Sequence, residues 1–167
     1  MNTITFKGSP LHLTGPLPAV GQKAPAFTLL ANDLTPRALQ DFAGKALVIA
    51  TVPSLDTPVC DTEIRRFNTE AAALSDKVRI LAVSCDLPFA QARWCGAAGI
   101  SAVQSLSDHR DTSFGQNYGV LIKELRLLAR AIFILDAQGV LRYVQLVSEM
   151  TSEPDYDAAL HAAKTAV

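Results

Sequence analysis

Cys60 combines a reactive residue type with a position that favours its ionised form. It follows a predicted buried strand and a loop that contains Pro53 and Pro58. We expect a helix to begin near this residue, and the free N–H groups at a helix start favour negative charge. A cysteine in that setting can exist as a thiolate, the nucleophilic form, at neutral pH. The alternative is a small buried hydrophobic residue, as free cysteines commonly are, and position alone does not decide between the two.

Two further residues are candidates to assist chemistry at Cys60. Thr57 precedes it by three residues, and its hydroxyl both donates and accepts hydrogen bonds, so it could orient a small oxygen-containing substrate. The same hydroxyl could instead cap a helix or a turn. Arg130 stands before the apolar run at residues 131–135, so it is either solvated at a strand end or directed at an anion such as a thiolate.

Other catalytic arrangements lack support in the sequence. Position 63 is Glu, so Cys60 does not begin a Cys-x-x-Cys dithiol. Glycine-rich phosphate-binding patterns are missing, and zinc-ligand spacing is missing because the cysteines and histidines are isolated. They are Cys60, Cys85, Cys95, His12, His109 and His161. A Cys–His dyad stays open, since its members need to meet only in space.

The hydrophobic pattern predicts the elements that position these residues. A continuous apolar run predicts a buried strand at residues 46–52, and a second buried strand is expected at 78–84, with shorter strands at 27–30 and 103–106. Helices are expected from about Cys60 onwards, at residues 88–98 and at 155–166, with a helical turn over residues 112–118. Hairpins are expected around Gly8-Ser9-Pro10 and between residues 129–135 and 140–147. This order predicts an α/β fold with a mixed sheet.

Length and composition limit the class of protein. The 167 residues fit a single domain over residues 1–167, and 49% hydrophobic residues exclude intrinsic disorder. A net charge of −1 argues against nucleic acid or an anionic membrane as the main partner, and no apolar run is long enough to span a bilayer. Three cysteines and no recognisable secretory signal predict a soluble protein of a reducing compartment, the cytoplasm.

Four ordered segments resemble one known family. Residues 53–60, PSLDTPVC, resemble the peroxiredoxin signature Pro-x-x-x-Thr-x-x-Cys. Residues 86–96, DLPFAQARWCG, are similar to the thiol peroxidase subfamily, the atypical two-cysteine type. Residues 129–131 (ARA) and 153–156 (EPDY) match the same subfamily, and the similarity covers essentially the whole chain.

This resemblance implies a thioredoxin-like fold, with a mixed central sheet flanked by helices and an added N-terminal β-hairpin. It assigns Cys60 as the peroxidatic nucleophile, with Pro53, Thr57 and Arg130 completing the peroxide site. It assigns Cys95 as the resolving thiol that forms an intramolecular disulfide with Cys60. The resemblance further implies a homodimer that is recycled by thioredoxin and that needs no metal or organic cofactor.

Two alternatives follow from the same residues. The family pattern does not require Cys85, which could take the resolving role in place of Cys95. The thiolate of Cys60 could also serve a redox sensor or binding protein that forms disulfides with partners and shows little peroxidase turnover.

Overall fold

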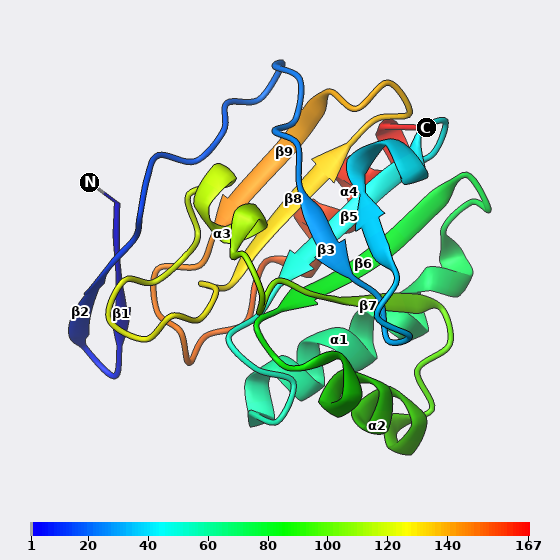
Figure 1. The fold of residues 1–167 in the computed structure, drawn as a ribbon. Helices are drawn as coiled ribbons and strands as arrows, with labels where there is room; N and C mark the ends of the chain where they lie inside the picture. Colours follow the sequence, from blue (N-terminus) through cyan, green and yellow to red (C-terminus); the bar gives the residue numbers. More distant parts are fainter. Residues whose placement is uncertain (1) are drawn as a thin grey trace.

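The computed structural model describes residues 2–167 and is built on one mixed sheet (Figure 1). Its strands are β3 (Thr28–Leu30), β4 (Pro36–Ala38), β5 (Ala46–Thr51), β6 (Val78–Ser84), β7 (Val103–Ser107), β8 (Ala131–Leu135) and β9 (Leu141–Leu146). They lie in the order β4-β3-β7-β6-β5-β8-β9. Strands β5, β6 and β7 are parallel, whereas β8 pairs antiparallel with β5 and β9 antiparallel with β8. A separate hairpin of β1 (Thr3–Phe6) and β2 (Ser9–His12) precedes the sheet. The predicted mixed α/β fold is confirmed.

Helices cover both faces of the sheet. They are α1 (Pro58–Glu70), α2 (Pro88–Ala98), α3 (Ser113–Asn117) and α4 (Tyr156–Thr165), with 3-10 turns η1 (Leu39–Phe42) and η2 (Ala71–Ala73). Phe67 of α1 and Ala163 of α4 pack in one apolar cluster with Val48 of β5. Phe114 of α3 packs on the opposite face with Leu47, the neighbour of Val48 on β5. Among the residues described, no helix is long and apolar enough to cross a membrane.

Two local details differ from the predicted pattern. The helix expected from about Cys60 onwards is α-helical only to Glu70 and continues as the tighter turn η2. Leu74, just after this turn, still packs against the apolar cluster that contains Phe67. Strand β4 was not predicted, because it is a short edge strand that begins at Pro36 and has no buried residue. Its position is set by pairing with β3 rather than by its own side chains.

The sheet topology brings distant segments to one edge. Strands β5 and β6 are parallel, so the loops that follow Thr51 and Ser84 leave at the same end of the sheet. Strand β8 runs in the opposite direction and pairs Ala131 with Thr51, so it begins at that end. Arg130, which immediately precedes β8, is therefore placed beside the loop that leads from β5 into α1.

Candidate active site

The start of α1 places Cys60 in its first helical turn. Pro58 occupies the beginning of the helix, where the missing N–H of proline costs no internal hydrogen bond. Thr57 stands at the N-cap position, but its side chain makes no capping hydrogen bond. Its Oγ1 lies 2.7 Å from the Sγ of Cys60 and 2.8 Å from the carbonyl oxygen of Ser54. The local fold therefore directs the Thr57 hydroxyl to the sulfur, and Cys60 itself is fully buried.

Arg130 is buried beside the same sulfur. Its Nη2 donates to the Cys60 Sγ at 3.4 Å and to the carbonyl oxygen of Met150 at 3.0 Å. Its Nη1 donates to the carboxylate of Glu63. Only 1% of Arg130 is exposed, so it does not lie at a solvated strand end. It faces the Cys60 sulfur and the Glu63 carboxyl group instead, in agreement with the other alternative from the sequence.

Glu63 is the site residue that sequence reasoning missed. It lies one turn after Cys60, is fully buried, and pairs with Arg130. Burial raises the pKa of its carboxyl to about 7, although the positive charge of Arg130 acts in the opposite direction. The sequence contains a usable indication: Cys60, Glu63, Ile64 and Phe67 form one buried stripe at helical spacing, and a carboxylate on such a stripe needs a partner.

A cavity of about 360 Å³ lies beside Thr57 and Arg130, the two residues whose side chains contact the Cys60 sulfur. Pro53, Thr57 and Arg130 line it, so the structure brings together the residues that the sequence predicted to accompany Cys60. Its remaining walls are mostly apolar and come from three segments of the chain. These are Phe6 and Lys7, Pro58 and Val59, and Met150 and Thr151. The cavity can admit a small oxygen-containing molecule and leaves room for an apolar body behind it.

The other two cysteines lie elsewhere. Cys95 is near the end of α2, where its Sγ donates to the Ser105 Oγ at 3.4 Å. It lines a different hollow, which includes Asn32 and Arg37. Cys85 packs against the α3 face of the sheet, opposite the face that carries Cys60. All three cysteines are free thiols, and the structure does not bring Cys95 into the cavity lined by Thr57 and Arg130.

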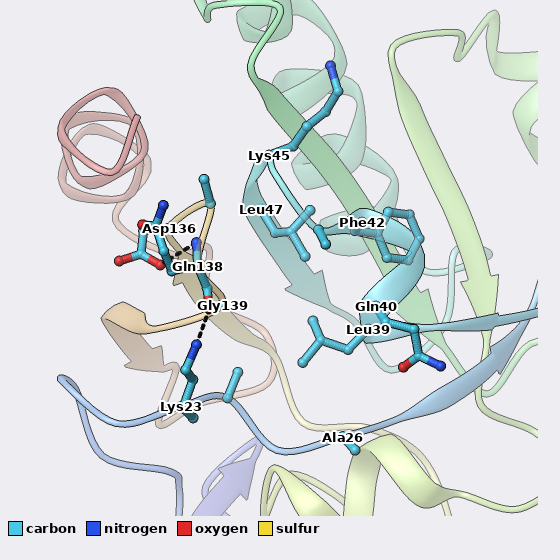
Figure 2. Close-up of a pocket in the computed structure, with 13 residues that line it drawn as sticks. Lys23, Ala26, Leu39, Gln40, Phe42, Lys45, Leu47, Asp136, Gln138 and Gly139 are labelled. Atoms are coloured by element: carbon cyan, nitrogen blue, oxygen red, sulfur yellow. Dashed lines mark hydrogen bonds between the residues drawn. The ribbon is translucent and has the colours of Figure 1, made fainter.

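A second cavity, of about 290 Å³, lies at the opposite end of the sheet (Figure 2). It is bordered by Leu47 at the beginning of β5 and by the turn at residues 136–139 after β8. The Lys23 Nζ crosses one side to donate to the carbonyl oxygen of Gln138. Neither Thr57 nor Arg130, the residues that contact the Cys60 sulfur, lines this cavity, so it is unsuited to the thiol chemistry that the sequence predicts.

The comparisons with known proteins agree with this geometry. The family model described as Redoxin matches residues 19–160, and the chain belongs to the redoxin family. Its similarity to named relatives extends over its full length. It is 57% identical to a thiol peroxidase of Halalkalibacterium halodurans over 100% of both chains. It is 54% identical to a thiol peroxidase of Bacillus subtilis over 100% of this chain and 99% of that one.

A solved structure extends the comparison to the fold. The crystal structure of a peroxiredoxin-like protein from Aquifex aeolicus superposes with a TM-score of 0.92 at 42% identity, and covers 99% of this chain and 97% of that chain. The resemblance to thiol peroxidases read from the sequence is confirmed, as is the thioredoxin-like fold, and the protein is an oxidoreductase.

Proposed function

We propose that the protein is a thiol-dependent peroxidase that reduces hydrogen peroxide and organic hydroperoxides to water or alcohols. The observation that carries the proposal is the surrounding of one buried sulfur. The Cys60 Sγ lies 2.7 Å from the Thr57 Oγ1 and 3.4 Å from the Arg130 Nη2, and both of these residues line one cavity. A hydroxyl and a guanidinium at these positions can hold a thiolate and a peroxide together.

In the first step the Cys60 thiolate attacks one peroxide oxygen. An S–O bond forms and the O–O bond breaks, so the sulfur is oxidised to a sulfenic acid. The other oxygen takes up a proton and leaves as water or an alcohol. Arg130 stabilises the negative charge that develops on the breaking bond. The Thr57 hydroxyl has a single proton, so it can turn from the Ser54 carbonyl to the thiolate or the peroxide as the charge moves.

In the second step the Cys95 thiol condenses with the sulfenic acid to give a disulfide and water. Thioredoxin, as an external dithiol, then reduces the disulfide by exchange. A disulfide requires Cα atoms within about 7 Å, so α1 and α2 must open locally. Two hydrogen bonds join these helices. The Trp94 Nε1 donates to Asp61 at 3.0 Å, and the Arg65 Nη1 donates to the Ala98 carbonyl oxygen at 3.2 Å.

Cys85 is the poorer candidate for the resolving thiol. It lies on the face of the sheet opposite Cys60, whereas Trp94, the neighbour of Cys95, packs in the same cluster as Cys60. Burial raises the pKa of the Cys85 thiol to about 12, helped by the charges of Asp108 and Asp86. A thiol that stays protonated is a weak nucleophile at neutral pH, which favours Cys95.

The proposed enzyme works in the cytoplasm as a homodimer and needs no metal or organic cofactor. This part of the proposal is supported by the resemblance of its four motifs to the thiol peroxidase subfamily. Sedimentation of the reduced protein at micromolar concentration tests it, since a species with the mass of a single chain would contradict the dimer.

A coupled assay with thioredoxin, its reductase and NADPH tests the activity. Wild type and Cys85→Ser should turn over peroxide repeatedly, Cys60→Ser should not, and Cys95→Ser should lose thioredoxin-dependent turnover. Peptide mapping after one equivalent of peroxide should find a Cys60–Cys95 disulfide. A redox sensor would instead consume about one equivalent and stop. A Cys60–Cys85 linkage, or unchanged turnover in Cys60→Ser, would contradict the assignments.

A further inference from the structure

The turn of the N-terminal hairpin forms one wall of the 360 Å³ cavity in the candidate active site. Phe6 and Lys7 line that cavity together with Thr57 and Arg130. The hairpin lies outside the central sheet, at the left of Figure 1. Phe6 is 41% exposed, which is high for a phenylalanine and leaves much of its ring open to a ligand.

Glu149 holds this turn in place. Its carboxylate accepts hydrogen bonds from the Thr5 hydroxyl (2.7 Å) and from the backbone N–H groups of Lys7 (3.0 Å) and Gly8 (3.2 Å). On its other side it accepts from the backbone N–H and the hydroxyl of Thr151, at 3.2 and 2.9 Å. These bonds, led by that of Thr5, lower the pKa of Glu149 to about 2, so it is an anion throughout the neutral range.

The backbone of the turn explains why an anion fits there. Lys7 and Gly8 both have positive φ, 51° and 81°, as the two central residues of a tight two-residue hairpin turn require. Successive N–H groups in such a turn point to one side and form a concavity that binds an anion. The carboxylate of Glu149 fills that concavity and supports the left-handed conformation of Lys7.

The segment that carries Glu149 also contacts the catalytic arginine. The Thr5 N–H donates to the Ser148 carbonyl at 2.7 Å, and the Met150 N–H donates to the Thr5 carbonyl at 2.9 Å. The Met150 carbonyl in turn accepts from the Arg130 Nη2. The hairpin, residues 148–151 and Arg130 thus form one continuous hydrogen-bonded network that ends at the Cys60 sulfur.

We infer that Glu149 is a positioning residue that holds the Phe6–Lys7 turn as a wall for the organic part of hydroperoxide substrates. The inference rests on the proposed peroxidase function. Hydrogen peroxide has two heavy atoms and fills a small part of the cavity, so it gains little from that wall. An organic hydroperoxide with an apolar body gains contact with Phe6 while its peroxide group reaches the sulfur. Glu149 therefore sets the preference between the two substrates.

The test compares Glu149→Gln with a matched control at the other end of the same hairpin. Glu124 accepts a hydrogen bond from the backbone N–H of His12, and its pKa is likewise lowered to about 2. Glu124→Gln therefore loosens the hairpin away from the cavity. The measurement is kcat/KM for cumene hydroperoxide and for hydrogen peroxide in the thioredoxin-coupled assay.

Glu149→Gln should lower the ratio of cumene hydroperoxide to hydrogen peroxide kcat/KM by about three- to ten-fold, the size expected when an apolar contact with an aromatic side chain is lost. Phe6→Ala, which leaves Glu149 intact, should lower the ratio by a similar factor. Glu124→Gln should leave the ratio within about two-fold, because the arginine and the turn keep their contacts.

The inference is overturned by an unmoved ratio in either Glu149→Gln or Phe6→Ala, and by an equal fall in Glu124→Gln. Phe6→Ala keeps the test decisive if Glu149→Gln fails to fold. A wild-type protein that turns over neither peroxide contradicts the proposed function itself. Normal wild-type turnover with an unmoved kcat/KM ratio in the variants contradicts only the proposed role of the Phe6–Lys7 turn.

Discussion

Replacement of Glu63 by Gln changes the charge balance around Cys60 while preserving its shape. Glu63 and Arg130 are both buried and paired, and Arg130 also contacts the Cys60 sulfur. A glutamine oxygen still accepts the hydrogen bond from Arg130, but it cannot ionise. The variant therefore represents the protonated form of Glu63 at every pH.

The size of the effect follows from the pKa of Glu63. Burial raises that pKa from 4.5 to about 7, so the folded state holds a proton that the unfolded chain releases. The stability gained from this proton is fully present below pH 4.5 and is lost as the pH rises through about 7. The full loss corresponds to about 3 kcal/mol, and most of it falls between pH 5 and pH 8.

Urea unfolding at pH 5 and pH 8 measures this difference. Both proteins should carry Cys60→Ser, so that ionisation of the thiol does not enter the comparison. The protein with Glu63 should lose about 2 to 3 kcal/mol more stability than Glu63→Gln between the two pH values. Asp108, whose pKa burial raises to about 6, titrates in both proteins and cancels. Parallel pH dependence would show that Glu63 stays ionised beside Arg130 and would refute the reasoning.

Four further substitutions test other parts of the structure. Arg130→Met keeps the apolar stem of the side chain but removes its charge. The substitution should lower the thiolate fraction of Cys60 and reduce kcat/KM by about ten- to a hundred-fold. Unchanged thiolate absorbance together with an unchanged rate would contradict this expectation. Trp94→Phe removes the hydrogen bond to Asp61 and should speed formation of the Cys60–Cys95 disulfide about five-fold after one equivalent of peroxide, as measured by thiol trapping; slower formation would argue against the contact as a restraint. Gly119→Ala would place a Cβ 2.2 Å from the Pro16 carbonyl oxygen at φ +69°, and it should lower the free energy of unfolding in urea by more than about 3 kcal/mol. Gly139→Ala has a similar φ of +74° but open space around the Cβ, so it should lower that free energy by about 1 kcal/mol. Equal losses in the two variants would show that backbone strain alone decides.

The elements that the sequence predicted best are those with local causes. Residues 46–50 and 80–83 are continuous apolar runs because β5 and β6 are central strands covered on both faces. Helix α2 begins at Pro88 and ends before Gly99, whose φ of 67° suits a glycine cap, so both ends are visible in the sequence. The sequence of strand β4 shows no apolar run or end signal of this kind, because the position of β4 is set by its pairing with β3.

The candidate site shows the same division. Thr57 and Cys60 belong to one short motif, so their proximity could be read from spacing. Arg130 reaches them because β8 pairs antiparallel with β5, a topological fact that apolar patterns do not encode. In the sequence, Glu63 served only to exclude a Cys-x-x-Cys dithiol. Its place on a buried helix face nevertheless indicates that its carboxylate has a charged partner. The contact of Glu149 with the N–H of Lys7 joins residues 142 positions apart and has no local sequence pattern.

The reduced arrangement and the proposed disulfide make opposite demands on the start of α1. A peroxide needs Cys60 held beside Thr57 and Arg130, which the helix provides by burying the sulfur completely. The disulfide needs Cys60 to leave that place and Cys95 to leave Ser105. The restraints between α1 and α2 are a few partly exposed hydrogen bonds, each worth about 1 kcal/mol, so opening costs far less than unfolding the sheet. We therefore expect contacts that hold α1 in the reduced arrangement to slow the proposed resolution step, and the hydrogen bonds of Asp61 and Arg65 between the two helices to affect its rate.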